Sequence, residues 1–571
     1  MKRLVLLVCL LVACGRAQQP SATTISLGLF STRTIHSLTV TPLETNAWMQ
    51  TCASCQHSAL RIPQRFGHIN RTVYLGGNLR FQSEGDAPAI EAAGLYTIVP
   101  TSSGLRVTLQ LPSERYVAAV LSAEASPDEP AASLEALAIT ARTFALVNLH
   151  RHKAEGFDYC DSTHCQALRL GPVRPAIAQA VRNTAGISLW NGPRRASIYY
   201  TQHCGGVSED VSALWPAERA FYLISHADPY CLRRSRASWQ AKISFTDLTR
   251  IASEQHWKLP TPITSIQITQ HTASGRAKLL EISGPAGTVQ ISASSLRFAI
   301  NRVLGWNHIR SDLYTVAITD GTLLFTGHGY GHGVGLCQAG AFQMAVEHHA
   351  AAEILAFYFP NTRPGLTPRG DLWHSETIGA VTLRTITPDP ELTQAVQLAW
   401  QRALALLPRA GEILQPTITL APTTELFRQL SNSPGYLLAV TRGNQITLQP
   451  LPILRGNGPI EPLILHELLH SLIESQSTDK APLWLREGLA EALADIQSPY
   501  TRPRSSLATI EQALAHPSTL SAYRQAHHDA GAIVRTLGRT YSLTVMRQWL
   551  HDGVPPQVLE KLHASTTGSL D

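Results

Sequence analysis

Apolar and polar residues alternate in short runs through the first part of the chain. The run Leu105–Leu111 is typical, and turn signals such as Gly76-Gly77 separate such runs. Alternation with a period of two marks half-buried strands, so residues 21–111 are predicted to be rich in β-structure.

The period then changes to that of helices. SERYVAAVLSAEA, which begins at Ser113, indicates one helix, and a stripe of Leu and Ala from Leu134 to Leu149 indicates a second. The proline-containing segment 126–130 breaks the pattern, so the two helices should meet at a short elbow. Alternating runs return over about 190–326, which makes the first domain mixed α and β.

A stretch rich in Pro, Gly and polar residues, 363–379, is expected to link a first domain, 20–362, to a second, 380–565. The second domain opens with a strand and an apolar helix near 392–407, returns to strands, and is helical to its end. The expected fold class is multidomain α+β: a β-rich first domain with inserted helices, then a mainly α-helical, zincin-like domain with a small N-terminal sheet.

Length and composition narrow the class of protein. A chain of 571 residues is too long for one hydrophobic core. Hydrophobic residues at 44% and charged residues at 15% exclude a disordered chain and a multispanning membrane protein. The net charge of +6 is spread singly, so nucleic acid is not an expected partner, whereas a mildly anionic polymer is compatible.

The N-terminal segment MKRLVLLVCLLVACGRAQQ, residues 1–19, is typical of a secretory signal peptide. Leu-Val-Ala-Cys, ending at Cys14, resembles a lipobox, in which that cysteine is lipidated and holds the protein on a membrane face. The alternative is ordinary cleavage after Ala17. Either way the protein is expected to be exported to the cell envelope and to touch a membrane only through a lipid anchor.

An oxidising compartment favours disulfides. The cysteines beyond this leader are odd in number, so at least one is free, metal-bound or paired with another molecule. Cys52 and Cys55 are predicted to form a local disulfide, and Cys204 and Cys231 are a second candidate pair.

Glu124 ends the first predicted helix in the apolar setting AAVLSAEAS. Desolvation raises the pKa of such a carboxyl, which makes it a candidate general acid. Arg142, on the second helix, is expected to fold back near Glu124 and either orient it or bind an anionic substrate. The alternative is an ordinary helix-end carboxylate with an ion-pair partner.

Four segments, in order over roughly 105–361, resemble the stage II sporulation protein D and LytB family. They are LPSERYVAAVLSAE at 111–124, ALAITARTF at 136–144, YTQHCGG at 200–206 and GHGYGHGVGLCQAGA at 327–341. The resemblance implies a peptidoglycan-binding domain in which Glu124, steered by Arg142, cleaves glycan strands as a lytic transglycosylase. It also implies an alternative, a non-catalytic enhancer of a separate cell-wall amidase.

A single carboxyl is sufficient for transglycosylation, because a sugar hydroxyl attacks intramolecularly where a hydrolase needs a second carboxylate. Glu124 would protonate the glycosidic oxygen and then accept the proton of the muramyl 6-hydroxyl, leaving a 1,6-anhydro end.

The glycine loop 327–341 is expected to form a wall of the sugar site, since glycines let a backbone approach a ligand closely. The residues expected to contact the glycan are Tyr200, His203, His328, His332 and Gln338. Thr201 and Cys337 depart from the family pattern, which has histidine and serine there.

Cys160, His164 and Cys165 form a further cluster. Some relatives hold a metal with Cys and His ligands, and a local disulfide is the alternative. The residues leave both open.

In HELLH, His466 and His470 lie one helical turn apart, the spacing that two imidazoles need to share a zinc ion. Glu467 would then be the general base beside it. Together with PLWLREGLAE, which supplies Glu487, the motif resembles the gluzincin peptidases. The resemblance implies that Glu487 is the third zinc ligand, with Glu491 one turn further on either supporting the ligands or as a less favoured ligand itself. An inactive remnant of the peptidase fold is the alternative.

His527 falls at about the place where such peptidases carry a tyrosine that stabilises the oxyanion. It is assigned to the catalytic set on that basis. A surface histidine pair with His528 is the alternative.

Overall fold

The computed structural model describes residues 24–567 apart from 46, 53–54, 56, 86–87, 409–413, 495–502 and 516–518. They form two compact units: a first comprising Ile25–Ser375 and Arg384–Pro388, and a second comprising Glu376–Leu383 and the described residues from Asp389 onward. Among the described helices none combines the length and apolar character that crossing a bilayer requires. The expected leader, with Cys14 and Ala17, lies outside the described residues.

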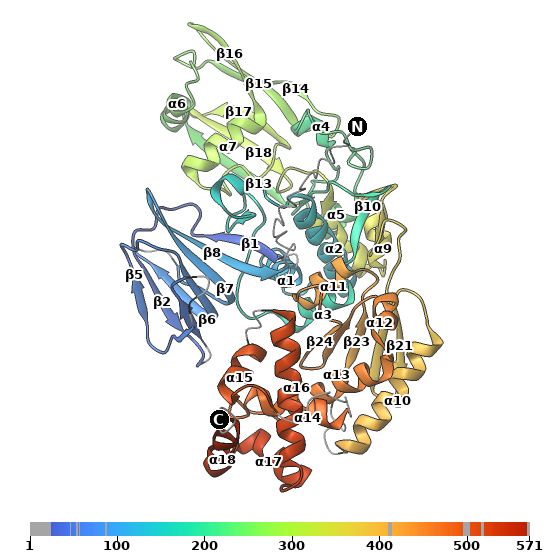
Figure 1. The fold of residues 1–571 in the computed structure, drawn as a ribbon. Helices are drawn as coiled ribbons and strands as arrows, with labels where there is room; N and C mark the ends of the chain where they lie inside the picture. Colours follow the sequence, from blue (N-terminus) through green and yellow to red (C-terminus); the bar gives the residue numbers. More distant parts are fainter. Residues whose placement is uncertain are drawn as a thin grey trace, which may run out of the picture. The chain divides into compact units, whose positions relative to one another are not determined.

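Within the described residues of the first unit, nine strands form one sheet in the order β4-β3-β6-β7-β8-β1-β9, and β2 and β5 join it through β6 (Figure 1). The strands are β1 (Thr24–Leu29), β2 (Leu38–Pro42), β3 (Trp48–Gln50), β4 (Ser58–Ala59), β5 (Gln64–Phe66), β6 (Val73–Ser83), β7 (Ile90–Thr101), β8 (Gly104–Pro112) and β9 (Tyr159–Cys160). The β-rich start is therefore confirmed. A disulfide joins Cys52 and Cys55, as predicted.

Two helices follow the sheet, as the change of period predicts. Helix α1 (Ser113–Glu124) begins directly after β8, and α2 (Ala131–Val147) begins after Pro130. Between them Ala125 is extended, which ends α1. The next residue, Ser126, directly precedes Pro127 and is disfavoured in the helical region, so the helix does not resume before the proline. Both helices bury most of their length, so the elbow is fixed by packing on either side.

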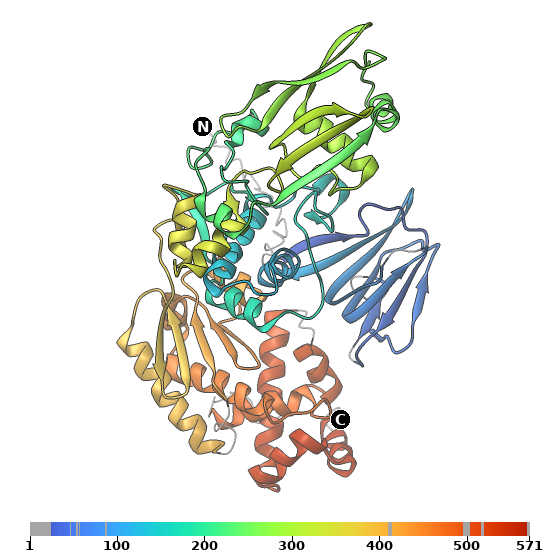
Figure 2. The ribbon, with the colours of Figure 1, turned by 180° about the vertical axis from the view of Figure 1, so that it is seen from behind.

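The chain then passes through α3 (Pro175–Asn183), β10 (Ser188–Asn191), β11 (Arg194–Arg195), β12 (Tyr200–Thr201), α4 (Val211–Leu214) and α5 (Pro229–Arg234). A subdomain with its own apolar core follows, shown in green in Figure 1 and from behind in Figure 2. It comprises β13 (Ser238–Ser244), α6 (Phe245–Glu254), β14 (Ser265–His271), β15 (Ala277–Gly284), β16 (Gly287–Ser292), α7 (Ala293–Leu304), β17 (Tyr314–Thr319) and β18 (Thr322–His328).

The subdomain leaves and rejoins the rest of the unit at one place. Its first strand pairs with its last, so that Ser238 faces His328. Just beyond these ends, β12 pairs in parallel with β19 (Leu336–Cys337), and α8 (Gln338–Val346) and α9 (Ala351–Tyr358) follow. Segments more than a hundred residues apart are thereby joined beside Glu124.

The expected linker, 363–379, is not free of regular structure. Strand β20 (Arg363–Gly365) pairs with β10, and β21 (His374–Ile378) opens the sheet of the second unit. Proline and glycine are tolerated in β20 because it lies at the edge of its sheet.

In the second unit, five described strands form a sheet in the order β21-β22-β23-β25-β24. Its elements are β21, β22 (Val381–Thr385), α10 (Pro390–Leu406), β23 (Thr417–Leu420), α11 (Thr424–Ser431), β24 (Ala439–Arg442), β25 (Gln445–Leu448), α12 (Leu451–Asn457), α13 (Ile460–Glu474), α14 (Leu483–Leu493), α15 (Leu507–Ala515), α16 (Leu520–Leu537), α17 (Leu543–Asp552) and α18 (Pro556–Thr567). A small sheet followed by helices matches the predicted order, and the whole chain is α+β and multidomain.

Candidate functional sites

Glu124 is the last residue of α1. Burial raises the pKa of its carboxyl, and two hydrogen bonds, from Gln338 and from the backbone of Ala167, oppose that rise. The Gln338 amide lies 3.1 Å from Glu124 Oε2. The C-terminal end of a helix also carries partial negative charge, which disfavours a carboxylate there. The site therefore favours a protonated acid.

Glu124 lines two hollows of the first unit. The first, of about 240 Å³, is lined among others by Glu124, Glu129, Gln202, His203, Arg234 and Gln338. The second, of about 450 Å³, is lined among others by Glu124, Tyr199, Tyr200, Trp215, Phe298 and His332. One acid thus faces a mainly polar hollow and a mainly aromatic one.

Gln338 is the first residue of α8, directly after the glycine loop. The loop is tight because its glycines pack against protein, and four of them have positive φ. A Cβ on Gly335 would collide with the carbonyl oxygen of Tyr199, and one on Gly333 with the guanidinium of Arg276. At these two positions glycine is required by neighbouring protein atoms, whereas the sequence predicted close approach to a sugar.

Two of the predicted substrate histidines are neutral and line the hollows. His203 accepts a hydrogen bond at Nδ1 from the Gly205 N–H, 3.0 Å away, and its Nε2 lies 3.0 Å from the carbonyl oxygen of Ser235. Burial lowers the pKa of His203 and lowers that of His332 to about 3. Neither ring therefore carries a proton at both nitrogens near neutral pH, and each offers one N–H donor.

Tyr200 lines the second hollow, and its hydroxyl accepts a hydrogen bond of 3.0 Å from Gln166. His328 differs from expectation: it ends β18, its side chain is exposed, and it lines neither hollow. The reason is strand alternation, since its buried neighbour Gly327 faces the interior and His328 the opposite side.

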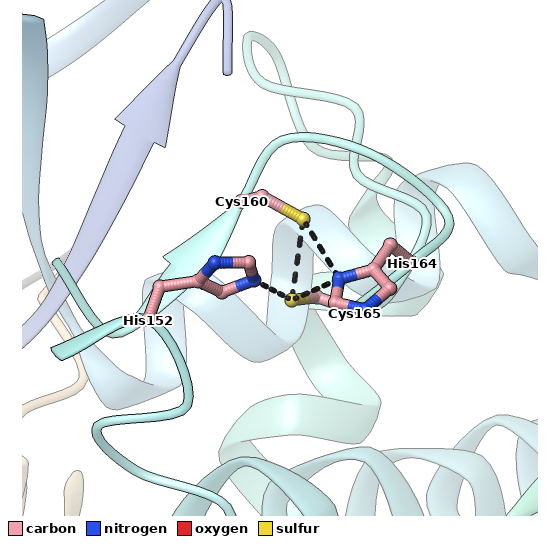
Figure 3. A group of neighbouring side chains, drawn as sticks. All are labelled: His152, Cys160, His164 and Cys165. Atoms are coloured by element: carbon pink, nitrogen blue, oxygen red, sulfur yellow. Dashed lines mark hydrogen bonds between the residues drawn. The ribbon is translucent and has the colours of Figure 1, made fainter. Parts of the chain in front are cut away.

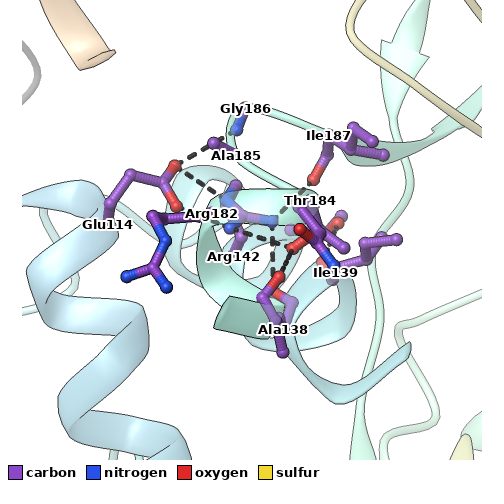
Figure 4. A network of polar contacts seen from close by, with 12 residues as sticks. Glu114, Ala138, Ile139, Arg142, Arg182, Thr184, Ala185, Gly186 and Ile187 are labelled. Carbon is purple, nitrogen blue, oxygen red and sulfur yellow. Dashed lines mark hydrogen bonds and ion pairs between the residues drawn. The ribbon is translucent and has the colours of Figure 1, made fainter. Parts of the chain in front are cut away.

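Arg142 does not pair with Glu124 as expected. Its guanidinium makes a two-pronged ion pair with Glu114, with nitrogen to oxygen distances of 2.9 and 2.6 Å, and donates to the carbonyl oxygen of Ile187 at 3.1 Å (Figure 4). Glu114 lies in the first turn of α1 and Glu124 at its end, about 15 Å away along the axis. Arg142, at 1% exposure, joins α1 to α2 and is not open to substrate.

Sequence reasoning missed several residues of the hollows. Trp215 stacks on Tyr199, with ring centroids 4.6 Å apart, and Gln166 holds Tyr200. Glu129 accepts hydrogen bonds from the backbone and side chain of Ser126, at 3.2 and 2.7 Å. No spacing pattern in the sequence marks these residues, because each belongs to an irregular segment placed by its neighbours.

Comparison with known proteins decides the family. The chain is 30% identical over 273 residues to an uncharacterized protein of Brachyspira hyodysenteriae, covering 47% of this chain and 71% of that protein. Residues 101–190 match the family described as stage II sporulation protein. The chain carries a domain of the stage II sporulation protein family. The region matched by the family holds α1, α2 and Glu124.

Two further relatives have names that describe a biological role. Stage II sporulation protein D of Bacillus amyloliquefaciens is 23% identical over 303 residues, which cover 49% of this chain and 81% of the relative. An amidase enhancer of Bacillus subtilis is 24% identical over 275 residues, covering 40% of this chain and 37% of the relative. Residues 224–335, which include the inserted subdomain, match a domain of unknown function, DUF8618.

A cluster of two cysteines and two histidines borders the second hollow of this family member (Figure 3). Cys165 Sγ lies 3.2 Å from Cys160 Sγ and 3.3 Å from His152 Nε2, and His164 Nδ1 lies 3.8 Å from Cys160 Sγ. The two sulfurs are not bonded. Two thiols and two imidazoles within 4.8 Å of one another are a donor set that suits zinc, and His152 was not foreseen.

In the second unit, α13 presents His466 and His470 on one face, with their Nε2 atoms 3.0 Å apart. Glu487, from α14, lies with one oxygen 3.3 Å from His466 and the other 3.2 Å from His470. These three ligand atoms all lie within 4.8 Å of one another, a donor set that fits zinc. Although burial alone lowers the pKa of His470, the Glu487 carboxylate outweighs it and raises that pKa to about 9.

His527, on α16, is no surface residue. Its side chain is 14% exposed, and its Nδ1 lies 2.6 Å from Glu487 and 3.6 Å from Glu491. Tyr523, one turn earlier, packs on the His527 ring with centroids 4.1 Å apart and was not foreseen. His527 therefore lies beside Glu487, the carboxylate that contacts His466 and His470.

Glu467 faces the neighbouring sheet. The Thr441 hydroxyl, on the edge strand β24, donates to Glu467 Oε2. The carboxylate is buried, so this bond fixes where its second oxygen points.

Proposed function

We propose that the first unit cleaves peptidoglycan glycan strands as a lytic transglycosylase, with Glu124 as its acid and base. The observation that carries the proposal is a single desolvated carboxyl, with a raised pKa, lining two hollows of which one is walled by aromatic rings. Apolar walls with a few directed polar groups are the usual lining of a site for a ring-shaped ligand. The names of the relatives, a sporulation protein and an amidase enhancer, agree with a role at the cell wall.

Glu124 alone can supply and take back the proton that the reaction requires. Its carboxyl gives a proton to the glycosidic oxygen as the bond from that oxygen to the anomeric carbon breaks. The 6-hydroxyl oxygen of the same muramyl residue bonds to the anomeric carbon, and its proton passes to Glu124. The acid is regenerated, and the product carries a 1,6-anhydro end.

The Gln338 amide holds Glu124 in place during both proton transfers, at 3.1 Å in the free enzyme. His203 and His332, being neutral, line the hollows without adding a competing acid. Arg234, in the first hollow, supplies a positive charge for the acidic groups of the muramyl side chains.

The first hollow contains a second carboxyl, and a pair of carboxyls is what glycoside hydrolysis requires. Glu129 lines that hollow, but Ser126 occupies one of its oxygens by two hydrogen bonds. A hydrolase would need a carboxylate free to activate water or attack the sugar. We therefore assign Glu129 to holding the elbow between α1 and α2.

Product analysis tests the proposal. Glycan strands are incubated with the full chain and the new ends identified by mass spectrometry. We expect 1,6-anhydro ends with the wild type and with Glu129→Gln, and none with Glu124→Gln. New reducing ends, lost in Glu129→Gln, would indicate a two-carboxylate hydrolase.

The alternative function, suggested by the relative named amidase enhancer, is a non-catalytic partner of a cell-wall amidase. It is favoured if the chain binds glycan, leaves it uncut and raises the rate of an added amidase. Glu124→Gln would then stimulate as well as the wild type.

We infer that the second unit is a zinc peptidase. His466, His470 and Glu487 would hold the ion, which supplies a Lewis acid and a water of lowered pKa. Glu467 would take the proton of that water, oriented by Thr441. His527 and Tyr523 would offer hydrogen bonds on the side of Glu487.

Zinc analysis of the full chain tests this assignment. His466→Ala should lower the zinc content by one equivalent per chain and abolish cleavage of peptide substrates. An unchanged zinc content in this variant would refute the ligand set. Glu467→Gln is the matched control, since it should keep the zinc and lose only the cleavage.

A further inference from the structure

Three cysteines and an aspartate lie together in the interior of the first unit. Cys204 follows β12, Cys231 lies in α5, Cys337 ends β19, and Asp228 caps the N-terminus of α5. All four residues are 0% exposed. They come from segments far apart in sequence, so the cluster depends on the folded chain.

The sulfurs are near one another but not bonded. Cys204 Sγ lies 3.4 Å from Cys231 Sγ and 3.2 Å from Asp228 Oδ2. A disulfide has a sulfur to sulfur length of about 2.05 Å and joins only two cysteines, so the candidate pair Cys204–Cys231 is not formed and would leave Cys337 alone. The expectation erred because a third thiol, Cys337, lies against the same pair.

The spacing suits a tetrahedral metal. The four ligand atoms lie within 4.8 Å of one another. Zinc bonds to sulfur of about 2.3 Å place the corners of a tetrahedron about 3.8 Å apart. The two separations from Cys204 Sγ, 3.4 and 3.2 Å, lie within about 0.6 Å of that spacing.

The hydrogen-bond donors around the sulfurs are those expected around metal-bound thiolates. The backbone N–H of Cys204 donates to Cys337 Sγ at 3.2 Å, and that of Gly206 donates to Cys231 Sγ at 3.1 Å. Such donors stabilise negative charge on sulfur, and metal sites depend on this outer shell.

The aspartate is held in the same manner. One oxygen of Asp228 accepts from the Cys231 N–H at 3.1 Å, and the other accepts from the Tyr358 hydroxyl at 2.9 Å. A ligating carboxylate with hydrogen-bond partners of this kind is kept in one orientation.

A buried cation lies beside the cluster. Arg276, 2% exposed, donates to the carbonyl oxygens of Cys204 and, at 3.0 Å, of Val207. Three thiolates and a carboxylate around a divalent ion keep a net negative charge, which this guanidinium partly offsets. Buried charge is costly unless compensated, and the carboxylates of Glu209 and Asp312 compensate Arg276 together with the cluster.

We propose that Cys204, Cys231, Cys337 and Asp228 bind a divalent cation of the zinc class at a closed, structural site. Four protein ligands leave no open position for substrate, and none of them is exposed. The ion fixes the residues that follow or precede its ligands: His203 before Cys204 and Gln338 after Cys337, both of which line the hollow of Glu124. The site stands whether the first unit cleaves glycan or only binds it.

The test uses the full chain with the other two metal sets disabled. In the variant Cys160→Ser/Cys165→Ser/His466→Ala, native mass spectrometry and elemental analysis should find about one zinc per chain. Adding Cys337→Ser should remove it. Adding Tyr358→Phe instead, which keeps all four ligands, should retain the site and weaken zinc affinity roughly 10–100-fold.

A second measurement covers the case in which Cys337→Ser fails to fold. Cobalt is substituted for zinc in the triple variant, and intense near-ultraviolet bands from cobalt bound to thiolates are expected. Absence of both metal and these bands overturns the proposal. So does a Cys204–Cys231 disulfide, seen as a loss of two hydrogen masses and a cross-linked peptide in the unreduced protein.

Discussion

Removal of the Arg142 guanidinium should destabilise the first unit and should do so through Glu114. In Arg142→Met the apolar stem is kept, but Glu114 loses both of its short contacts and the Ile187 carbonyl loses a donor. Breaking a buried ion pair by removing one partner costs about 3–5 kcal/mol. The Glu114 side chain is 18% exposed, so water recovers part of its solvation and we expect about 3 kcal/mol.

The double variant Arg142→Met/Glu114→Gln, compared with both single variants, measures the pair itself. It removes the unpaired charge, so it should be more stable than Arg142→Met alone, with a coupling of about 1–3 kcal/mol. Hydrogen exchange of α1 and α2 peptides, followed by mass spectrometry over a urea series, reports the first unit while peptides of α13 serve as the internal control. Unchanged protection in Arg142→Met, together with lost glycan cleavage, would refute the structural role and favour contact with substrate.

Three further predictions follow from the two sites. Glycan cleavage should fall as pH rises through the raised pKa of Glu124, because the protonated acid starts the reaction. Gln338→Leu removes a hydrogen bond that lowers this pKa, so cleavage by this variant should fall at a higher pH than cleavage by the wild type, measured as product yield against pH. Since the folded pKa of Glu124 exceeds the unfolded one, the wild type loses stability as pH rises between them, and Glu124→Gln should gain relative stability there, seen as a higher unfolding midpoint at neutral pH but not at acid pH. Thr441→Val should lower peptide cleavage roughly fivefold, for about 1 kcal/mol of lost hydrogen bond, with the zinc content unchanged; a change in zinc content would contradict its assignment to Glu467.

The local pattern of the sequence was sufficient for the elements around Glu124. Helical periodicity before and after a proline-containing break predicts α1 and α2, and the apolar residues before Glu124 predict the desolvation that raises its pKa. The same reasoning reached the face shared by His466 and His470, since both lie on one helix.

The local pattern does not predict which side chains of different helices and strands contact each other. Whether Arg142 meets Glu114 or Glu124 depends on how α2 lies along α1, which periodicity does not determine. His152 and Tyr523 join their clusters from segments with no motif, because their positions are set by packing of the neighbouring chain. Nor does periodicity show that Gly335 and Gly333 lie against Tyr199 and Arg276.

The paired strands β13 and β18 at the base of the inserted subdomain allow parts of its sequence to change independently of the residues around Glu124. Because Ser238 and His328 face each other, the segments of the subdomain that contact nothing outside it can grow or shrink while the two ends stay at the same distance. An apolar core supports those segments, whereas Arg276 and Phe298 are kept in place by their contacts with the cysteine cluster and the second hollow. Homologous chains should therefore differ in length mainly in those segments, and changes there would alter what the subdomain contacts while leaving the surroundings of Glu124 unchanged.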